Sequence, residues 1–483
     1  MNRQISQLFG LAVVLFGLLI VFTSRWTVFE AKSLEDETAN RRPLIEEQKI
    51  PRGLIYARDG RTLLARNRPI GHGQNRIFTR VYPTGDLFGH PVGYSFIRNG
   101  RRGLEQSRND DLAGKEDEFE SILSDLENRT TEGLDVVTNL DADAQRTAFQ
   151  ALGGQKGGVV AIEPRTGKVR VMASNPPYDP NAVPERFSQL NRDPNKPLLN
   201  RTTQELYPPG STFKVVTAAA ALDSGLVTPD SIIDGSSPRV VSGTPLSNFG
   251  GEDFGPISLT DALTHSVNTV FAQVGEKVGR RTLVEYMHRF GFFEDPKLDY
   301  PDDQMVASGV RNADGKLVGG GGGFDVGRVA IGQGGAEGQI LATPIQMAEV
   351  AAAIANDGTL MKPQLTDRVV RKDGRVKERV KPDVQNEVVK PSTAKELAAM
   401  MSRVVEEGTG TAAALEGVNV AGKTGTAEVG VNAELTQPWF IAFAPVENPR
   451  VAIAVTVEHS TGEGGTVAAP IAKQVLEVLL RNG

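Results

Sequence analysis

A serine and a lysine three residues apart open an alanine-rich stretch, and this pair could form a nucleophile. Ser211 and Lys214 follow the helix breakers Pro208-Pro209-Gly210, and the run from Val215 to Leu222 predicts a buried helix. Residues three apart share a helix face, with Cβ atoms roughly 5–6 Å apart. A serine hydroxyl needs an adjacent base, and an amine among apolar neighbours resists protonation. The pair therefore predicts a lysine-activated serine, at a helix start whose unpaired N–H groups could stabilise an oxyanion.

A second tetrad of the same type, Ser392-Thr-Ala-Lys395, favours a structural role. Thr393 and Glu396 fit a capping box that opens a helix, which would leave Lys395 on a solvated first turn. A chain of this length should contain about one such tetrad by chance. The Ser211 motif therefore needs further partners before it indicates an enzyme.

Ser266-Val-Asn268 precedes an apolar predicted helix and is the second candidate motif. Its hydroxyl could relay a proton to a leaving amine, and its carboxamide could hold a peptide carbonyl. A helix-start cap explains the same two residues equally well. His265 beside them is interpreted as a helix-face residue, because the five histidines of the chain show no metal-ligand spacing.

The third candidate motif is Lys423-Thr-Gly-Thr426, on a predicted strand. A strand edge can pair with an extended peptide, Lys and Thr side chains can meet a carboxylate, and Gly425 would allow close approach. Residues 417–424 also match the phosphate-binding P-loop pattern. That loop needs a helix directly after it, whereas Gly425, Gly430 and Pro438 predict strand and turn. The phosphate-binding interpretation is therefore rejected.

The elements that must hold these motifs predict an α+β fold. Strands are predicted at 158–163, 168–174, 418–428, 439–444 and 451–458. A final helix is predicted from Pro470, and mainly helical sequence lies between the two groups of strands. This order implies one antiparallel five-stranded sheet flanked by helices. Residues 306–338, which include a glycine run from Gly319 to Gly323, are interpreted as a mobile loop.

The N-terminal third predicts an anchor followed by a small domain. Residues 1–25 are interpreted as a cytoplasmic stub and an uncleaved transmembrane helix, with a cleaved signal peptide as the alternative. Residues 26–153 are interpreted as a non-catalytic α+β domain, and residues 154–483 as the domain that carries the motifs. In the N-terminal domain we expect a polar spacer at 30–49 and a hairpin at 52–65 that turns at Asp59-Gly60. We expect an irregular surface at 89–112 and a helix at 139–152.

Bulk composition excludes several classes of function. The chain has 483 residues, 39% of them hydrophobic and 23% charged, which is typical of a globular protein of about two to four domains. A net charge of −6 argues against nucleic acid as the main partner. The absence of cysteine excludes disulfides, thiolate catalysis and cysteine-bound zinc. We expect neither a metal nor a cofactor.

The three motifs, in this order, resemble those of the penicillin-binding proteins and serine β-lactamases, in which Asp stands where this chain has Val267. The resemblance covers nearly the whole chain and is strongest to class B penicillin-binding proteins, within them to the actinobacterial penicillin-binding protein A group. Further segments that carry it are Arg52-Gly-Leu-Ile, Gly103-Leu-Glu105, Tyr178-Asp-Pro-Asn181, Ile331-Gly-Gln-Gly334 and Thr343-Pro-Ile-Gln-Met347.

The resemblance implies a peptidoglycan D,D-transpeptidase, in which Ser211 attacks the penultimate D-Ala carbonyl of a stem peptide and expels the terminal D-Ala. Lys214 would take the serine proton, Ser266 would relay it, and Lys423 would support this network electrostatically. An amine of a neighbouring stem would then take the acyl group. By the same resemblance, β-lactams acylate Ser211.

Substrate-binding roles follow from the resemblance too. Asn268 would hold the donor peptide, Thr424 and Thr426 would bind its carboxylate beside Gly425, and the N–H groups of Ser211 and Thr426 would form the oxyanion hole. The resemblance also implies a single-pass membrane protein with an extracytoplasmic catalytic domain, and partnership with a membrane glycosyltransferase and other cell-wall proteins. A D,D-carboxypeptidase, or a receptor or scaffold without turnover, are the alternatives. No Glu-x-x-Leu-Asn follows Ser266, so we expect the acyl-enzyme to persist.

Overall fold

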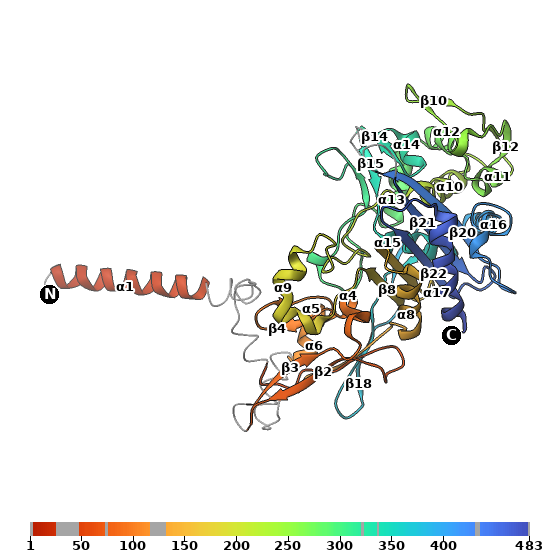
Figure 1. Ribbon diagram of the computed structural model, residues 1–483. Helices are drawn as coiled ribbons and strands as arrows, with labels where there is room; N and C mark the ends of the chain where they lie inside the picture. The colour runs from red at the N-terminus through yellow and green to blue at the C-terminus, as the bar shows by residue number, and fades with distance from the viewer. Residues whose placement is uncertain are drawn as a thin grey trace.

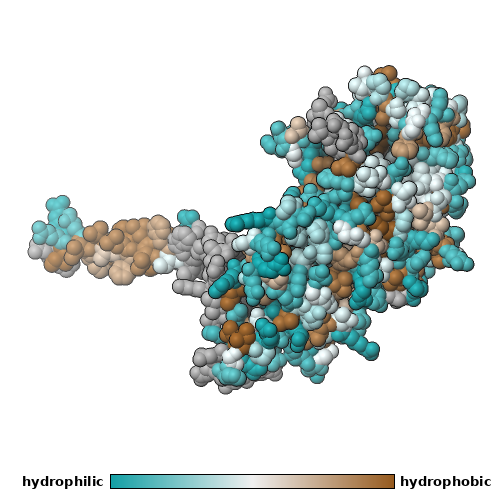
Figure 2. All heavy atoms as spheres, viewed as in Figure 1, coloured by the Kyte–Doolittle hydropathy of each residue, from teal (hydrophilic) through white to brown (hydrophobic). Residues whose placement is uncertain are grey.

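The computed structural model describes residues 3–25, 48–72, 76–115, 132–319, 323–335, 338–429 and 435–481. The expected polar spacer at 30–49 lies almost wholly outside these residues. Helix α1 (Arg3–Ser24) is fully exposed, and it is long and apolar enough to cross a membrane, with a mean hydropathy of 2.5. Figure 2 shows it as a continuous brown rod that ends in a hydrophilic cap. Its length and composition fit the expected anchor.

A six-stranded sheet of order β18-β17-β6-β1-β2-β3 forms the N-terminal part of the folded body. The predicted hairpin is confirmed, because β1 pairs antiparallel with β2 and Gly60 turns the chain at φ 65°. Two strands come from far along the chain, so β18 lies at the same end of the molecule as β2 and β3 (Figure 1). The strand bounds are Ile55–Tyr56 for β1, Leu63–Ile70 for β2, Ile77–Val81 for β3, Asp135–Thr138 for β6, Thr366–Val370 for β17 and Val376–Arg379 for β18.

The interpretation of residues 89–112 as irregular surface is wrong. This segment forms short elements, namely α4 (Gly89–Val92), β4 (Ser95–Phe96), β5 (Gly100–Arg101), α5 (Leu104–Ser107) and α6 (Asn109–Ala113). Leu104 and Glu105 are completely buried. Gly93 serves close packing, since a Cβ there would lie 1.9 Å from the Arg102 carbonyl oxygen. Gly93, Leu104 and Glu105 therefore belong to an interior, whereas the arginines of this segment lie at least partly at the surface.

The predicted five-stranded antiparallel sheet is confirmed, in the order β20-β21-β22-β7-β8. Alternate residues of β21 belong to two separate hydrophobic cores, with Ile441 facing one and Phe440 the other. Helices α8 and α17 cover the Phe440 face, whereas α15, α10 and α16 pack on the other side. The bounds are Ala421–Val429 for β20, Leu435–Ala444 for β21, Val451–Val457 for β22, Gly157–Ile162 for β7, Val169–Asn175 for β8, Ala142–Leu152 for α8, Ala469–Arg481 for α17, Pro344–Ala355 for α15, Lys214–Asp223 for α10 and Pro391–Glu406 for α16.

The predicted mobile loop at 306–338 is wrong where the structure describes it. Strands β14 and β13 pair with β15 on either side, α14 lies between β13 and β14 in the chain, and Val310, Phe324 and Ile340 are buried. Residues 320–322 of the glycine run lie outside the described chain. The bounds here are Gly309–Arg311 for β13, Val326–Ala330 for α14, Gly334–Gly335 for β14 and Gly338–Leu341 for β15.

Between α10 and α15 the chain forms helices, as predicted, and adds two small two-stranded sheets that were not predicted. Strand β9 pairs with β12, and β10 pairs with β11. The remaining bounds are Val183–Arg192 for α9, Ile232–Asp234 for β9, Arg239–Val241 for β10, Thr244–Leu246 for β11, Pro256–Ser258 for β12, Leu259–Thr264 for α11, Asn268–Val278 for α12, Arg280–Arg289 for α13, Thr359–Met361 for β16 and Val384–Glu387 for β19.

The second tetrad is structural, although not through the predicted capping box. Helix α16 has Lys390 as its N-cap, with no side-chain cap bond. The Thr393 hydroxyl donates instead to Asp223, at 2.9 Å, because α10 ends beside this helix. Lys395 is exposed, as predicted.

Candidate active site

Lys214 connects the first two predicted motifs. It is the first residue of α10, and its side chain is completely buried. Its amine donates to the Ser266 carbonyl at 2.6 Å and to Asn268 Oδ1 at 2.7 Å, and it lies 3.2 Å from the Ser266 hydroxyl. Segments 52 and 54 residues apart in sequence thus meet at one nitrogen.

Ser266 and Asn268 occupy a strained turn between two helices. Helix α11 ends at Thr264, Ser266 has a φ of 61°, and α12 begins at Asn268. A positive φ at a residue other than glycine costs backbone energy and is found at functional sites. The Asn268 amide donates to the Ser247 carbonyl at 3.0 Å, which directs its oxygen toward Lys214. The helix-cap interpretation of this motif is wrong, because Val267 is the N-cap and no side chain caps the helix.

Lys423 is the second buried amine of the site. It lies on β20, is completely inaccessible to solvent, and donates to the Thr424 carbonyl at 3.1 Å. Within the described chain, neither Lys423 nor Lys214 forms an ion pair with a carboxylate. Burial lowers the pKa of Lys423 to about 7. Burial, and then repulsion from Lys423, lower the pKa of Lys214 well below its usual value.

Ser211 stands on a 3₁₀ turn, η5 (Gly210–Phe213), that runs directly into α10. It is half-buried, while Thr212 and Phe213 beside it are buried. In the described residues its hydroxyl makes no hydrogen bond, so its oxygen is available to a substrate. The first three residues of the Ser-x-x-Lys motif are 3₁₀ rather than α-helical, and the described hydrogen bonds of the Lys214 amine go to Ser266 and Asn268.

Two glycines let the Ser211 turn pack on the edge strand. A Cβ on Gly210 would lie 3.1 Å from the Thr426 carbonyl group, and a Cβ on Gly425 would lie 2.7 Å from the Pro209 carbonyl oxygen. The close approach at Gly425 is therefore made by the chain's own backbone. Trp439 adds a hydrogen bond from its indole to the Pro208 carbonyl, at 3.0 Å.

Thr424 and Thr426 take different positions. By strand alternation both point away from the face that Lys423 occupies. Thr424 is buried, and its hydroxyl is bonded to the Thr409 hydroxyl at 2.6 Å. The Thr426 hydroxyl accepts from the Gly464 N–H at 3.1 Å and is half-buried, so its own hydrogen can still be donated.

The free edge of β20 exposes backbone groups beside Ser211. Strand β20 is an edge of its sheet, and Thr426 lies opposite Pro438, which has no N–H. The Pro438 carbonyl accepts from Thr456 of β22. We infer that Thr426 forms a non-hydrogen-bonded pair with Pro438, so its N–H faces the open edge. An extended peptide can add there as a further strand.

Sequence reasoning missed four supporting residues. Phe271 places its ring 5.7 Å from the Lys214 amine, and Ser247, Thr409 and Gly464 bond to Asn268, Thr424 and Thr426. Phe271 lies three residues after Asn268 in α12, so helical spacing could have found it. Ser247 and Thr409 lie in loops, Gly464 begins a π-helical turn (Gly464–Ala468), and none of the three carries a local signal.

Comparison with known proteins assigns the two folded parts to described families. A model of the penicillin binding protein transpeptidase domain matches residues 157–477, and a model of the penicillin binding protein A dimerisation domain matches residues 52–136. Peptidoglycan D,D-transpeptidase PbpA of Mycolicibacterium smegmatis is 35% identical and covers 100% of both chains. PbpA of Mycobacterium tuberculosis is 33% identical over 100% of this chain and 99% of its own length.

Solved structures agree with these relatives. An imipenem acyl-enzyme complex of penicillin-binding protein A from M. tuberculosis superposes with a TM-score of 0.79 at 32% identity, covering 90% of this chain and 99% of that chain. The D,D-transpeptidase domain of a peptidoglycan glycosyltransferase from Eggerthella lenta has a TM-score of 0.77 at 32% identity, covering 90% and 99%.

Proposed function

This chain belongs to the class B penicillin-binding proteins, and we propose that its three motif segments form the active site of that family's reaction. It is a serine-type peptidoglycan D,D-transpeptidase, inhibited by β-lactams that acylate it. The observation that carries our assignment of residues is the pair of buried amines, Lys214 and Lys423, beside the Ser211 turn. No carboxylate in the described chain neutralises them.

Ser211 is the nucleophile and Lys214 its base. The Ser211 oxygen attacks the carbonyl carbon of the penultimate D-Ala, and the neutral Lys214 amine takes the hydroxyl proton. Burial and the neighbouring Lys423 lower the pKa of the Lys214 amine well below its usual value, which favours the neutral form that this step needs. Such proton transfer contributes about 10²–10⁴-fold to rate.

Ser266 passes the proton to the leaving group. Its hydroxyl lies 3.2 Å from the Lys214 amine, so the proton taken from Ser211 can move through it. The carbon–nitrogen bond of the tetrahedral intermediate then breaks. The departing D-Ala amine takes that proton, and the acyl-enzyme ester remains on Ser211.

The edge of β20 binds the donor peptide. The backbone N–H groups of Ser211 and Thr426 form the oxyanion hole, which the packing of Gly210 on Thr426 supports. The Thr426 hydroxyl donates to the terminal carboxylate, and Asn268 holds a peptide amide. Thr424 acts indirectly, through its buried bond to Thr409.

An amine from a second stem peptide completes the reaction. It attacks the ester carbon, Lys214 accepts its proton, and Ser211 leaves as the alcohol, which forms the cross-link. A D,D-carboxypeptidase would use water in this step, and a non-turnover receptor or scaffold would stop at the acyl-enzyme. The first is the stronger alternative, because the same residues serve either acceptor.

The membrane setting follows from α1. We propose that α1 anchors the chain, that residues 26–153 form a non-catalytic domain, and that residues 154–483 form the extracytoplasmic transpeptidase domain. The N-terminal sheet includes β17 and β18, which belong in sequence to the second domain, and this pairing would hold the two domains together. A membrane glycosyltransferase is the proposed partner, as supplier of glycan strands that carry the stem peptides.

Two assays test these roles. The full-length protein in detergent is treated with penicillin, and its labelled peptide is identified by mass spectrometry. We expect the adduct on Ser211, its loss in Ser211→Ala, and unchanged labelling in the matched Ser392→Ala. A D-Ala-D-Ala donor is then supplied with an amine acceptor. Cross-linked product supports the transferase. Release of D-Ala without cross-linked product supports the carboxypeptidase, and the absence of both products supports the receptor.

A further inference from the structure

A cavity of about 360 Å³ lies at one end of the central sheet. The turn between β7 and β8 and the turn between β21 and β22 form its walls, with Arg58 of the N-terminal hairpin and Leu479 of α17. Its volume falls within the range of small-molecule sites, about 300–1,000 Å³. The cavity is distinct from the active site, because the β7 end of the sheet is three strands from Lys423.

Four arginines line this cavity with one carboxylate. Arg58 pairs with Asp141 at 2.9 Å, and Arg170 pairs with Glu163. Arg450 donates to a backbone carbonyl of α17, that of Leu480, at 3.0 Å.

Arg165 is exposed and has no ion pair or hydrogen bond in the part of the chain that the structure describes. The described contacts thus give four guanidinium groups two carboxylate partners.

Arg58 and Arg170 lie close enough to repel one another. Burial lowers the pKa of the Arg170 guanidinium, Glu163 opposes this effect, and the charge of Arg58 reinforces it. Because arginine does not lose its proton at physiological pH, this repulsion is not relieved by deprotonation. An anion that enters the cavity relieves it, and guanidinium forks bind the paired oxygens of carboxylates and phosphates.

We propose that this cavity binds an oxyanionic ligand with at least two negative charges, carried on carboxylate or phosphate groups. Arg58 belongs to the N-terminal hairpin, whereas Arg165 and Arg450 belong to turns of the transpeptidase sheet. A bound dianion therefore bridges the two parts of the molecule. Leu479 and Val451 supply an apolar wall for the carbon skeleton of the ligand.

Calorimetric titration of the full-length protein in a neutral detergent tests this proposal. Citrate probes a carboxylate source and pyrophosphate a phosphate source, both at constant ionic strength. We expect at least one probe to bind the wild type, and the stronger of the two identifies the source. The double variant Arg165→Gln/Arg450→Gln should weaken binding about tenfold or more, since it removes two charge-assisted contacts.

A matched control distinguishes binding at this cavity from nonspecific attraction of anions to the positive charge of the protein. Arg192→Gln/Arg375→Gln removes the same charge at two exposed arginines outside the cavity and should leave affinity unchanged. Equal weakening in both double variants would overturn the site, as would the absence of heat from both probes at millimolar concentration. Far-ultraviolet circular dichroism checks that each variant is folded, and Arg165→Gln alone provides a milder variant at an exposed position.

Discussion

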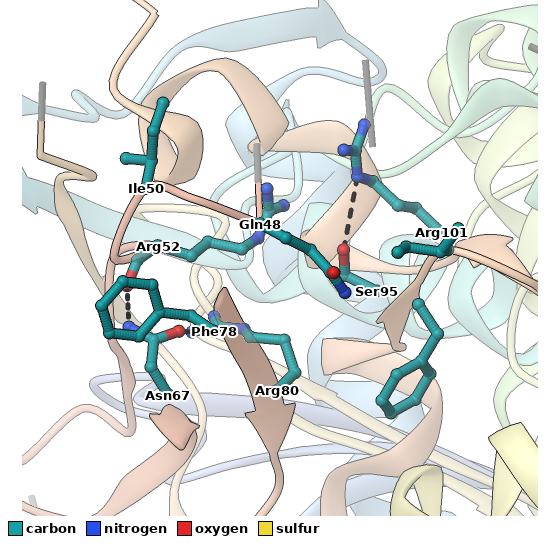
Figure 3. Close-up of a pocket in the computed structure, with 10 residues that line it drawn as sticks. Gln48, Ile50, Arg52, Asn67, Phe78, Arg80, Ser95 and Arg101 are labelled. Atoms are coloured by element: carbon teal, nitrogen blue, oxygen red, sulfur yellow. Dashed lines mark hydrogen bonds between the residues drawn. The ribbon is translucent and has the colours of Figure 1, made fainter. Parts of the chain in front are cut away.

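Two of the regions that bury positive charge treat it in opposite ways. In the N-terminal domain, Arg52 and Arg80 both bond the buried Glu105 carboxylate, at 2.7 and 2.6 Å. At the proposed transpeptidase site, Lys214 and Lys423 are completely buried but reach only neutral oxygens. Figure 3 shows the first region, where Arg52, Asn67 and Arg80 line a small pocket opposite Ser95 and Arg101.

The difference supports the proposal that the second region does the chemistry. Burial alone would raise the pKa of Glu105, yet the Arg80 and Arg52 guanidiniums hold it below its usual value. That cluster keeps fixed charges and therefore serves as a structural tie. Burial without a carboxylate partner lowers the pKa of both lysines, that of Lys423 to about 7, and a neutral amine can act as a base. Charge pairing gives rigidity in the first region, and in the proposed mechanism its absence gives reactivity in the second.

Removal of the unpaired base should have the largest effect. Lys214→Met should lower the rate of acylation by a β-lactam about 10²–10⁴-fold, because Ser211 loses the group that takes its proton. Stopped-flow measurement with a chromogenic cephalosporin gives this rate. The matched variant Lys395→Met, at the second tetrad, should acylate normally. A Lys214→Met protein with wild-type kinetics would contradict the assigned base.

Breaking the paired cluster should cost stability rather than chemistry. Glu105→Gln leaves two buried guanidiniums without their anion and should lower the free energy of unfolding by about 3–5 kcal/mol. Denaturant titration measures this loss. The acylation rate of the folded fraction should change little. Asp373→Asn, at an exposed ion pair, is the control and should shift stability by less than about 1 kcal/mol.

Lys423→Met should raise the free energy of unfolding, in contrast to Glu105→Gln, which should lower it. The variant removes a buried amine that is costly to charge, so it should gain a few kcal/mol in unfolding free energy near pH 7 while it loses activity. In the wild type the unfolded chain binds this proton up to about pH 10, whereas the folded amine releases it above about 7. Wild-type stability should therefore rise between these two pH values.

Thermal unfolding across that pH range, compared between wild type and Lys423→Met, measures this effect. The part of the pH dependence of stability that Lys423 contributes should disappear in the variant. An identical pH dependence in both proteins would show that the Lys423 amine keeps its usual pKa.

The smallest expected effects distinguish the two threonines of β20. Thr426→Val removes a hydroxyl that we assign to the substrate carboxylate, so acylation should slow about tenfold, the value of one hydrogen bond to a charged group. Thr424→Val breaks a buried bond to Thr409 and should lower stability by about 1 kcal/mol with little change in rate. Equal kinetic defects would place both hydroxyls at the substrate.

The sequence alone determined those features that depend on local order in the chain. Short apolar runs bounded by turns predicted the five strands of the central sheet, Asp59-Gly60 predicted a hairpin, and the length of α1 predicted an apolar span. The three motifs could be recognised in the sequence because each is a short run of defined residue types at fixed spacing. Their roles in this chain still rest on the proposed mechanism.

Only the tertiary structure decided which polar groups are buried and what they contact. Residues 89–112 were misread because the partners of Glu105 lie 53 and 25 residues earlier in the chain. Lys214 meets Ser266 across 52 residues, and Thr424 differs from Thr426 only through the loops that each one touches. Burial and charge pairing are set by contacts between distant segments, so no local pattern could have specified them.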